Sequence, residues 1–95
     1  MILHGKQKLR DFCDKYADAR SPLSSWETEV EDAQWRTPQD IKNKYPKASI
    51  VDGKNIVFDI CGNKYRLWVL VAYKMGIVTI IDVGTHTKYN KWKIK

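Results

Sequence analysis

Apolar side chains in the first third of the chain recur with the period of a helix. One set lies at i, i+3, i+4 and i+7 and predicts a helix over roughly residues 5–19; it consists of Leu9, Phe12, Cys13 and Tyr16. A second set predicts a helix that runs to about residue 34; it consists of Leu23, Trp26, Val30 and Ala33. Ser21 is the expected N-cap of this second helix, because Pro22 suits the first helical position. The pattern therefore predicts two amphipathic helices.

A third, shorter helix is predicted directly after them. Thr37 and Pro38 repeat the start signal, and Asp40 stands at the third helical position, from which its carboxylate can reach back to the cap. Ile41 and Tyr45 are expected to face inward, and Pro46 ends the helix.

The second half of the chain changes to the alternation that is typical of strands. Residues 56–61 alternate, residues 65–73 are rich in β-branched and aromatic side chains, and residues 77–83 form a third apolar run. Gly62-Asn63 and Lys74-Met75-Gly76 provide the turns between them. Residues 50–51 and 1–3 are candidates for short additional strands. Strands at this spacing favour an antiparallel meander.

These elements predict one α+β domain over residues 1–95. The expected architecture is an antiparallel four- to five-stranded sheet with two or three helices packed on one face, since each helix has a single apolar stripe.

Length and composition exclude several classes of protein. The longest apolar run, Leu67 to Tyr73, is seven residues and too short to span a bilayer, and the N-terminus does not resemble a secretory signal. Cys13 and Cys61 are expected to be free thiols in a reducing cytoplasm. No paired-ligand spacing of Cys or His occurs, so neither a metal nor another cofactor is expected.

The net charge of +6 lies entirely in the second half of the chain. Residues 46–95 contain nine basic and three acidic side chains, whereas the basic and acidic side chains of residues 1–45 balance. Such asymmetry favours a polyanionic partner, with nucleic acid as the leading candidate. The alternative is a solubilising surface with a lysine-rich tail.

Three ordered motifs between residues 37 and 92 resemble one family. A turn and strand start carry Gly62, Asn63 and Arg66; a strand end carries Val83, Thr85, His86 and Tyr89; and an upstream pattern carries Pro38, Ile41, Lys42, Tyr45 and Pro46. In this arrangement the chain resembles the HigB-type toxins of bacterial type II toxin–antitoxin systems, a branch of the RelE superfamily.

The resemblance implies both a fold and an activity. The implied fold is the RelE-like, microbial-ribonuclease-like sheet with helices on one face. The implied activity is that of a metal-independent endoribonuclease, an mRNA interferase that cuts mRNA on the translating ribosome. The implied partner is a helix-turn-helix antitoxin of the HigA type. The toxin would contact operon DNA only indirectly, through this antitoxin.

The residues in these motifs suit the chemistry of RNA cleavage, in which the ribose 2′-OH attacks the adjacent phosphate. Arg66 can stabilise charge on the phosphorane, because its planar guanidinium pairs with phosphate oxygens. His86 suits acid–base work near neutral pH, and Tyr89 can donate a proton, orient the 2′-OH or stack on a base. Lysines that could contact neighbouring phosphates are Lys54, Lys64, Lys88 and Lys91.

Strand parity gives a geometric expectation for these residues. Arg66 should point to the same face as Trp68, and His86 should share its parity with Val78, Ile80 and Asp82. Arg66 and His86 stand near opposite termini of antiparallel neighbours, so they can meet at one edge.

Other interpretations of the same residues stay open. Arg66 could pair with Asp59 or Asp82 across the sheet, His86 could be a polar loop residue, and Tyr89 could anchor a helix. Each lysine could be an ordinary surface residue, whereas Trp68 and Trp92 are interpreted as core and C-terminal anchoring residues. The general base also stays open, with Lys54 as one candidate.

Two alternative functions remain in different classes. One is a non-catalytic module that binds RNA or DNA through the basic face. The other is a degenerate toxin that acts only by binding an antitoxin.

Overall fold

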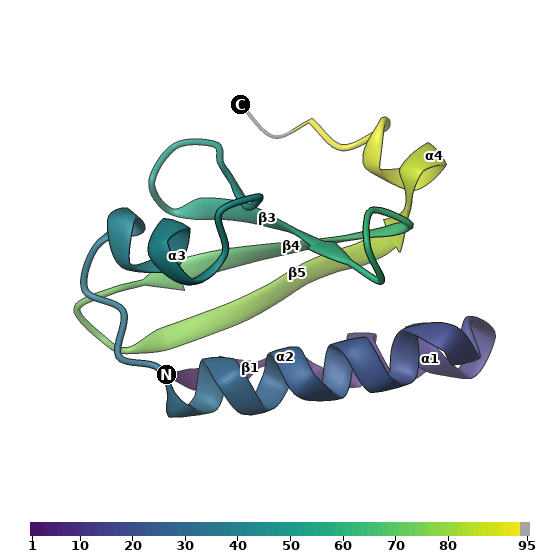
Figure 1. The fold of residues 1–95 in the computed structure, drawn as a ribbon, viewed down its shortest axis with the longest axis horizontal. Helices are drawn as coiled ribbons and strands as arrows, with labels where there is room; N and C mark the ends of the chain where they lie inside the picture. Colours follow the sequence, from purple (N-terminus) through teal and green to yellow (C-terminus); the bar gives the residue numbers. More distant parts are fainter. Residues whose placement is uncertain (94–95) are drawn as a thin grey trace.

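The structure, a computed structural model, describes residues 1–93 and contains one five-stranded sheet. The strands are β1 (Ile2–His4), β2 (Ser49–Ile50), β3 (Asn55–Ile60), β4 (Tyr65–Ala72) and β5 (Ile77–Thr85), and their order across the sheet is β1-β5-β4-β3-β2. The helices are α1 (Lys6–Lys15), η1 (Ala17–Ala19), α2 (Arg20–Asp32), α3 (Pro38–Lys44) and α4 (His86–Tyr89) (Figure 1). The α+β prediction and its sheet of four to five strands are confirmed.

The expectation of a purely antiparallel sheet is wrong at one edge. β2, β3, β4 and β5 pair antiparallel, but β1 pairs parallel with β5, so the sheet is mixed. Three α-helices and the short η1 lie between β1 and the rest of the sheet in the sequence, and such a long connection permits a parallel pairing. Gly5 makes the turn from β1 into α1 at a φ of 89°, and a Cβ there would lie 3.0 Å from the Ile80 carbonyl oxygen.

The predicted boundary between the first two helices is also wrong. α1 ends at Lys15, a short η1 follows, and α2 begins at Arg20 with Ala19 as its N-cap, so Ser21 lies inside the helix. The Tyr16 ring packs 4.6 Å from that of Phe12, which ends α1 against the core before the predicted position. Pro22 is still tolerated, because N–H groups in the first turn of a helix have no intrahelical partner.

The third helix follows its predicted start signal. Thr37 accepts a hydrogen bond from the Asp40 backbone N–H, and the Asp40 carboxylate accepts from the backbone N–H groups of Arg36 and Thr37. These two backbone donors lower the pKa of Asp40 below its usual value. The capping box fixes α3 so that Ile41 is fully buried and the Tyr45 ring lies 5.0 Å from that of Phe58.

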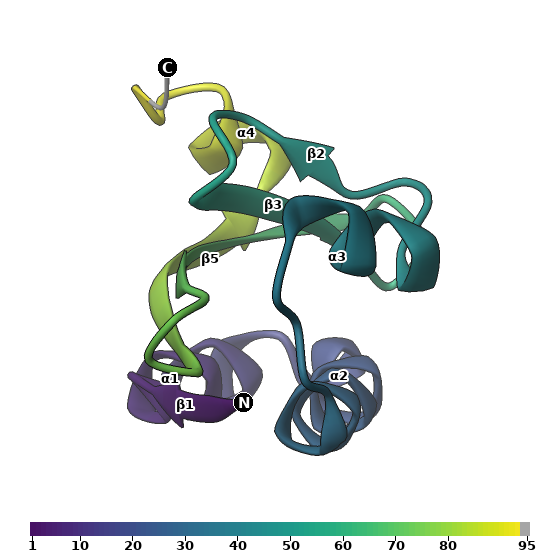
Figure 2. The ribbon, with the colours of Figure 1, turned by 90° about the vertical axis from the view of Figure 1, so that its left-hand side faces the viewer.

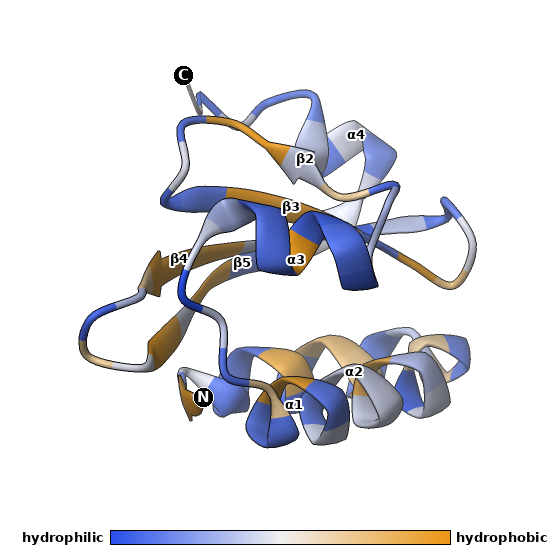
Figure 3. Ribbon diagram, turned by 60° about the vertical axis from the view of Figure 1, so that its left-hand side comes forward, coloured by the Kyte–Doolittle hydropathy of each residue, from blue (hydrophilic) through white to orange (hydrophobic). Residues whose placement is uncertain are grey.

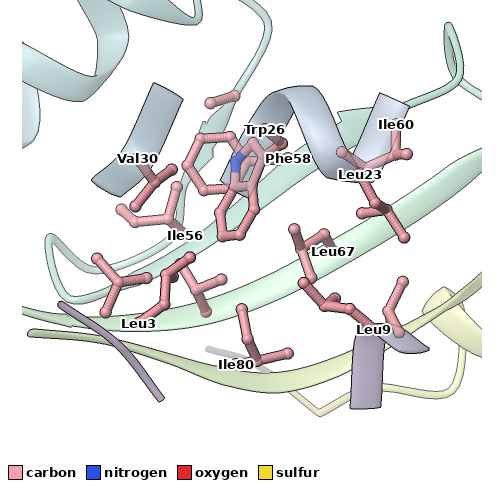
Figure 4. Close-up of a cluster of buried hydrophobic side chains, with 14 of the residues drawn as sticks. Leu3, Leu9, Leu23, Trp26, Val30, Ile56, Phe58, Ile60, Leu67 and Ile80 are labelled. Carbon is pink, nitrogen blue, oxygen red and sulfur yellow. The ribbon is translucent and has the colours of Figure 1, made fainter. Parts of the chain in front are cut away.

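The hydrophobic core lies between α1, α2 and α3 and one face of the sheet. Figure 4 shows Leu9, Leu23 and Trp26 of the helices packed with Phe58 and Leu67 of the sheet. The same helices turn their apolar stripes toward the sheet and their polar residues outward (Figure 3). Within residues 1–93, no helix is both long enough and apolar enough to cross a membrane.

A β-bulge in β5 brings the side chain of Asp82 to the second face of the sheet, opposite the core. Trp68 pairs with Asp82 but Val69 pairs with Ile80, so β5 contains one extra residue at this point. Ile80 is buried in the core, whereas Asp82 turns to the face that carries Trp68. The parity predicted for Asp82 and Ile80 is therefore wrong, because the extra residue reverses the alternation between them. α4 lies on the opposite side of β3 from α2 and α3 (Figure 2).

Candidate active site

Two segments distant in sequence meet at one end of the sheet. Tyr65, at the start of β4, pairs with Thr85, at the end of β5, and Arg66 pairs with Gly84. His86 follows directly as the first residue of α4. The expectation that Arg66 and His86 meet at one edge is therefore confirmed.

Arg66 lies in a dense set of contacts and its side chain is only 14% exposed. Its guanidinium lies 3.2 Å from the Asp59 carboxylate and donates to the Asn63 carbonyl oxygen at 2.9 Å. The Tyr89 ring lies over the guanidinium, with 5.3 Å between its centroid and the Cζ atom. Of the two ion pairs that the sequence allowed, Arg66 forms the one with Asp59.

His86 is exposed, and its ring reaches the same carbonyl oxygen. Its Nε2 lies 2.5 Å from the Asn63 carbonyl oxygen, which can only accept a hydrogen bond. Nε2 therefore carries a hydrogen, which it donates to this oxygen. Arg66 and His86 thus direct two N–H groups at one oxygen atom.

Tyr89 completes the cluster from the next turn of α4. Its ring centroid lies 6.2 Å from that of His86, with the two rings nearly perpendicular, and it is half-buried over Arg66. The three predicted residues Arg66, His86 and Tyr89 are therefore brought together by the β3–β4 turn, the end of β5 and α4.

Asp82 holds this C-terminal segment on the sheet. Its carboxylate accepts hydrogen bonds from the Trp92 indole N–H at 3.0 Å and from the Val83 backbone N–H at 2.8 Å, and it pairs with Lys88 at 2.9 Å. The Lys88 side chain crosses Gly84 so closely that a Cβ there would lie 2.6 Å from it. The anchoring role of Asp82 is not predictable from the sequence, because no sequence signal indicates the bulge that turns this side chain toward Trp92.

The two tryptophans pack on this second face. Their ring centroids lie 5.6 Å apart, and the Trp68 indole N–H donates to the Asn55 side chain. The expectation that Trp92 anchors the C-terminal segment is confirmed. Trp68 was expected in the core but lies half-buried on the opposite face, as its parity with Arg66 requires.

The four candidate lysines have different surroundings. Lys88 lies on α4 and Lys91 follows it by two residues, and both line a pocket with Thr87 and with Phe12 and Lys15 of α1. Lys64 instead pairs with Asp18 at 2.5 Å. Lys54 precedes β3 by one residue, about 16 Å from Asp59 along an extended strand.

The Asp18 carboxylate neutralises Lys64 and also accepts from the Tyr65 hydroxyl at 2.6 Å. These two hydrogen bonds lower the pKa of Asp18, and the same carboxylate raises the pKa of Lys64 and of Tyr65. Lys64 therefore ties η1 to the β3–β4 turn.

The thiols and other ligand-type side chains do not gather at this site. Cys13 and Cys61 are both free, as predicted, and burial raises the pKa of Cys13. Residues 1–93 contain no group of three or more His, Cys, Asp or Glu side chains arranged to hold a metal ion.

A mixed sheet with helices on one face and a clustered Arg, His and Tyr on the other agrees with a RelE-like protein. Comparison with protein families supports the same class: the family described as the HigB toxin, the RelE-like toxic component of a toxin–antitoxin system, matches residues 19–92. This match covers most of the chain, so the chain belongs to that family, and membership implies an antitoxin as its partner. A search of curated proteins finds no match.

Proposed function

We propose that the protein is an mRNA interferase: a toxin that cleaves mRNA on the translating ribosome in the cytoplasm, without a metal, and that a HigA-type helix-turn-helix antitoxin neutralises. The observation that carries this proposal is the convergence of Arg66 and His86 on the Asn63 carbonyl oxygen, beneath Tyr89.

That carbonyl oxygen indicates which ligand the two side chains accept. It is an oxygen with partial negative charge that receives one N–H from a guanidinium and one from an imidazole. A non-bridging oxygen of a phosphodiester has the same requirements and carries more negative charge, so it would bind both groups more strongly.

Each residue then has a role in the reaction. The 2′-OH gives up its proton to a water molecule as its oxygen forms a bond to phosphorus and the bond to the 5′-oxygen breaks. Arg66 stabilises the charge that develops on the phosphorane, and protonated His86 donates the Nε2 proton to the leaving 5′-oxygen. Tyr89, whose ring lies over Arg66, orients the ribose 2′-OH. The products are a 2′,3′-cyclic phosphate and a 5′-hydroxyl end.

Lys88 and Lys91 support this proposal by their position. Lys88 directly precedes Tyr89 on α4 and Lys91 follows it by two residues, where an ammonium group attracts the phosphates that flank the cleaved bond. Lys88 shares its charge with Asp82, so Lys91 is the stronger candidate for a phosphate contact.

One observation favours a non-catalytic alternative. Arg66 is largely covered and already paired with Asp59, as a purely structural arginine would be. A degenerate toxin that only binds its antitoxin would have this feature without cleaving RNA.

Induced expression in bacteria separates the two functions. Wild type, His86→Ala and the matched control His4→Ala, whose histidine is exposed on β1, are compared for growth arrest and for new mRNA 5′ ends by primer extension. We expect arrest and cuts from wild type and His4→Ala, but neither from folded His86→Ala. Soluble wild type that causes no cuts would favour the degenerate toxin, and cleavage of naked mRNA as fast as ribosome-bound mRNA would contradict ribosome dependence.

A further inference from the structure

A pocket of about 270 Å³ lies next to the Arg66 cluster on the same face of the sheet. One wall comes from the β2–β3 edge and the other from the C-terminal segment; the lining residues are Ser49, Val51, Val57, Tyr89, Asn90 and Trp92. Figure 2 shows β2 and α4 on the same side of β3, although the sequence separates them widely. The pocket therefore exists only when the C-terminal segment is packed on the sheet.

The lining has a distinctive chemistry. Two aromatic rings and two valines provide flat apolar walls, the Ser49 hydroxyl and the Asn90 amide provide hydrogen-bonding groups besides the Tyr89 hydroxyl, and none of the six side chains is charged. Such a lining suits a flat, neutral, aromatic group with a polar edge and disfavours a charged ligand. The volume lies just below the range of about 300–1,000 Å³ for larger organic ligands, which points to a group of small size.

Tyr89 connects this pocket to the phosphate site proposed above. Its ring lines the pocket and also lies 5.3 Å from the Cζ atom of Arg66. A group bound in the pocket is therefore within one nucleotide of a phosphate bound at Arg66. Trp92 is held by Asp82 and Trp68, so the aromatic wall is fixed before any ligand arrives.

We propose that this pocket binds one unpaired nucleobase of the RNA, adjacent to the cleaved phosphate, and that Ser49 and Asn90 determine which base it accepts. The proposal rests on the proposed function, because it places the base on the same RNA strand. The aromatic walls supply affinity for any base, and the hydroxyl and amide supply the difference between bases.

Dinucleotides with a 2′-O-methyl group test the proposal, because they contain one phosphate and cannot be cleaved by 2′-OH attack. Each is titrated into the full-length protein and followed by ¹H–¹⁵N NMR, together with versions in which one base or the other is replaced by an abasic unit. We expect saturable shifts of the Trp92 indole N–H and the Asn90 backbone amide. We also expect removal of one particular base to weaken binding about five- to a hundredfold.

Matched variants test the specificity claim. Asn90→Ala and Ser49→Ala should change the ranking of the four bases in that one position, whereas Asn43→Ala on α3 and Ser25→Ala on α2 should leave it unchanged. Lys91→Ala should weaken all dinucleotides equally, because a phosphate contact carries no information about the base.

The outcomes separate the two proposals. Equal binding of abasic and intact dinucleotides, or shifts confined to Arg66 and His86, would overturn the base pocket while leaving the nuclease function in place. No shifts, together with no mRNA cleavage by wild type, would overturn both. Pocket shifts that appear with the antitoxin but with no dinucleotide would make the pocket a protein-docking site and refute the proposal.

Discussion

Replacing Asp82 with alanine should detach the C-terminal segment that carries His86 and Tyr89. The substitution removes the carboxylate that accepts from the Trp92 indole N–H at 3.0 Å and that pairs with Lys88 at 2.9 Å. A hydrogen bond to a charged acceptor contributes about 1.5–3 kcal/mol, whereas a half-exposed ion pair contributes about 0–1 kcal/mol. We therefore expect the attachment to weaken by about 2–3 kcal/mol, roughly 30- to 150-fold in its equilibrium constant.

Global stability should fall less than the attachment, because a released Trp92 indole can bind water. A loss of about 2 kcal/mol corresponds to a Tm lower by roughly 8–16 °C for a domain of this size. Asp82→Asn keeps an acceptor for the indole and should lie between wild type and Asp82→Ala. Lys88→Ala removes only the half-exposed pair and is the matched control, with an expected loss under about 1 kcal/mol.

Hydrogen exchange and the Trp92 indole N–H signal, both measured by NMR, report the attachment directly, and mRNA cleavage reports its consequence. We expect faster exchange over residues 86–92 in Asp82→Ala and cleavage reduced about a hundredfold, since a displacement of 1 Å can cost that much. An unchanged indole signal with unchanged exchange would refute the role of the carboxylate. Detachment with full cleavage would instead remove α4 from the active site.

Four further predictions follow from the structure. Phe58→Ala should lower the free energy of unfolding by about 3–5 kcal/mol in urea titrations, because the ring contacts three other aromatic residues in the core. Thr37→Ala should cost about 1 kcal/mol in the same assay through loss of the helix cap. Asp18 has a lowered pKa in the folded state, so its stabilising effect is present above its unfolded pKa of about 3.9 and is lost as the pH falls through the lower folded pKa. The difference in unfolding free energy between wild type and Asp18→Asn, measured by urea titration at several pH values, should therefore shrink toward pH 2. Lys91→Ala should reduce the salt dependence of RNA binding by about one unit of slope in fluorescence titrations, whereas Lys54→Ala, at the far end of β3, should leave it unchanged.

Local patterns predicted most of the fold because the local preferences agree with the final packing. The capping box of Thr37 and Asp40 needs only residues three apart, and the alternation of Ile56, Phe58 and Ile60 already specifies which face is buried. Elements of this kind need no knowledge of distant neighbours.

The errors arise where tertiary contacts override local signals. Ser21-Pro22 is a good start signal, but packing of Tyr16 against Phe12 and Tyr65 ends α1 earlier and lets α2 begin at Arg20. β1 is three residues long, and its direction depends on the helical connection that brings it beside β5. Neither fact is encoded in a short window of sequence.

The candidate site contains features that the sequence predicts and features that only tertiary contacts determine. Arg66 and His86 could be placed at one edge from strand order alone, because the start of one antiparallel strand lies beside the end of its neighbour. Their common target, the Asn63 carbonyl oxygen, could not, because no side-chain pattern marks a backbone acceptor. The β-bulge is the decisive addition: by shifting the parity of β5 after Ile80, it turns Asp82 to the face of Arg66 while Ile80 stays in the core. Without this extra residue, the carboxylate would point into the apolar core, and nothing would fix α4 above Arg66. The bulge thus allows one strand to bury Ile80 in the core and to present Asp82 to the polar site on the opposite face.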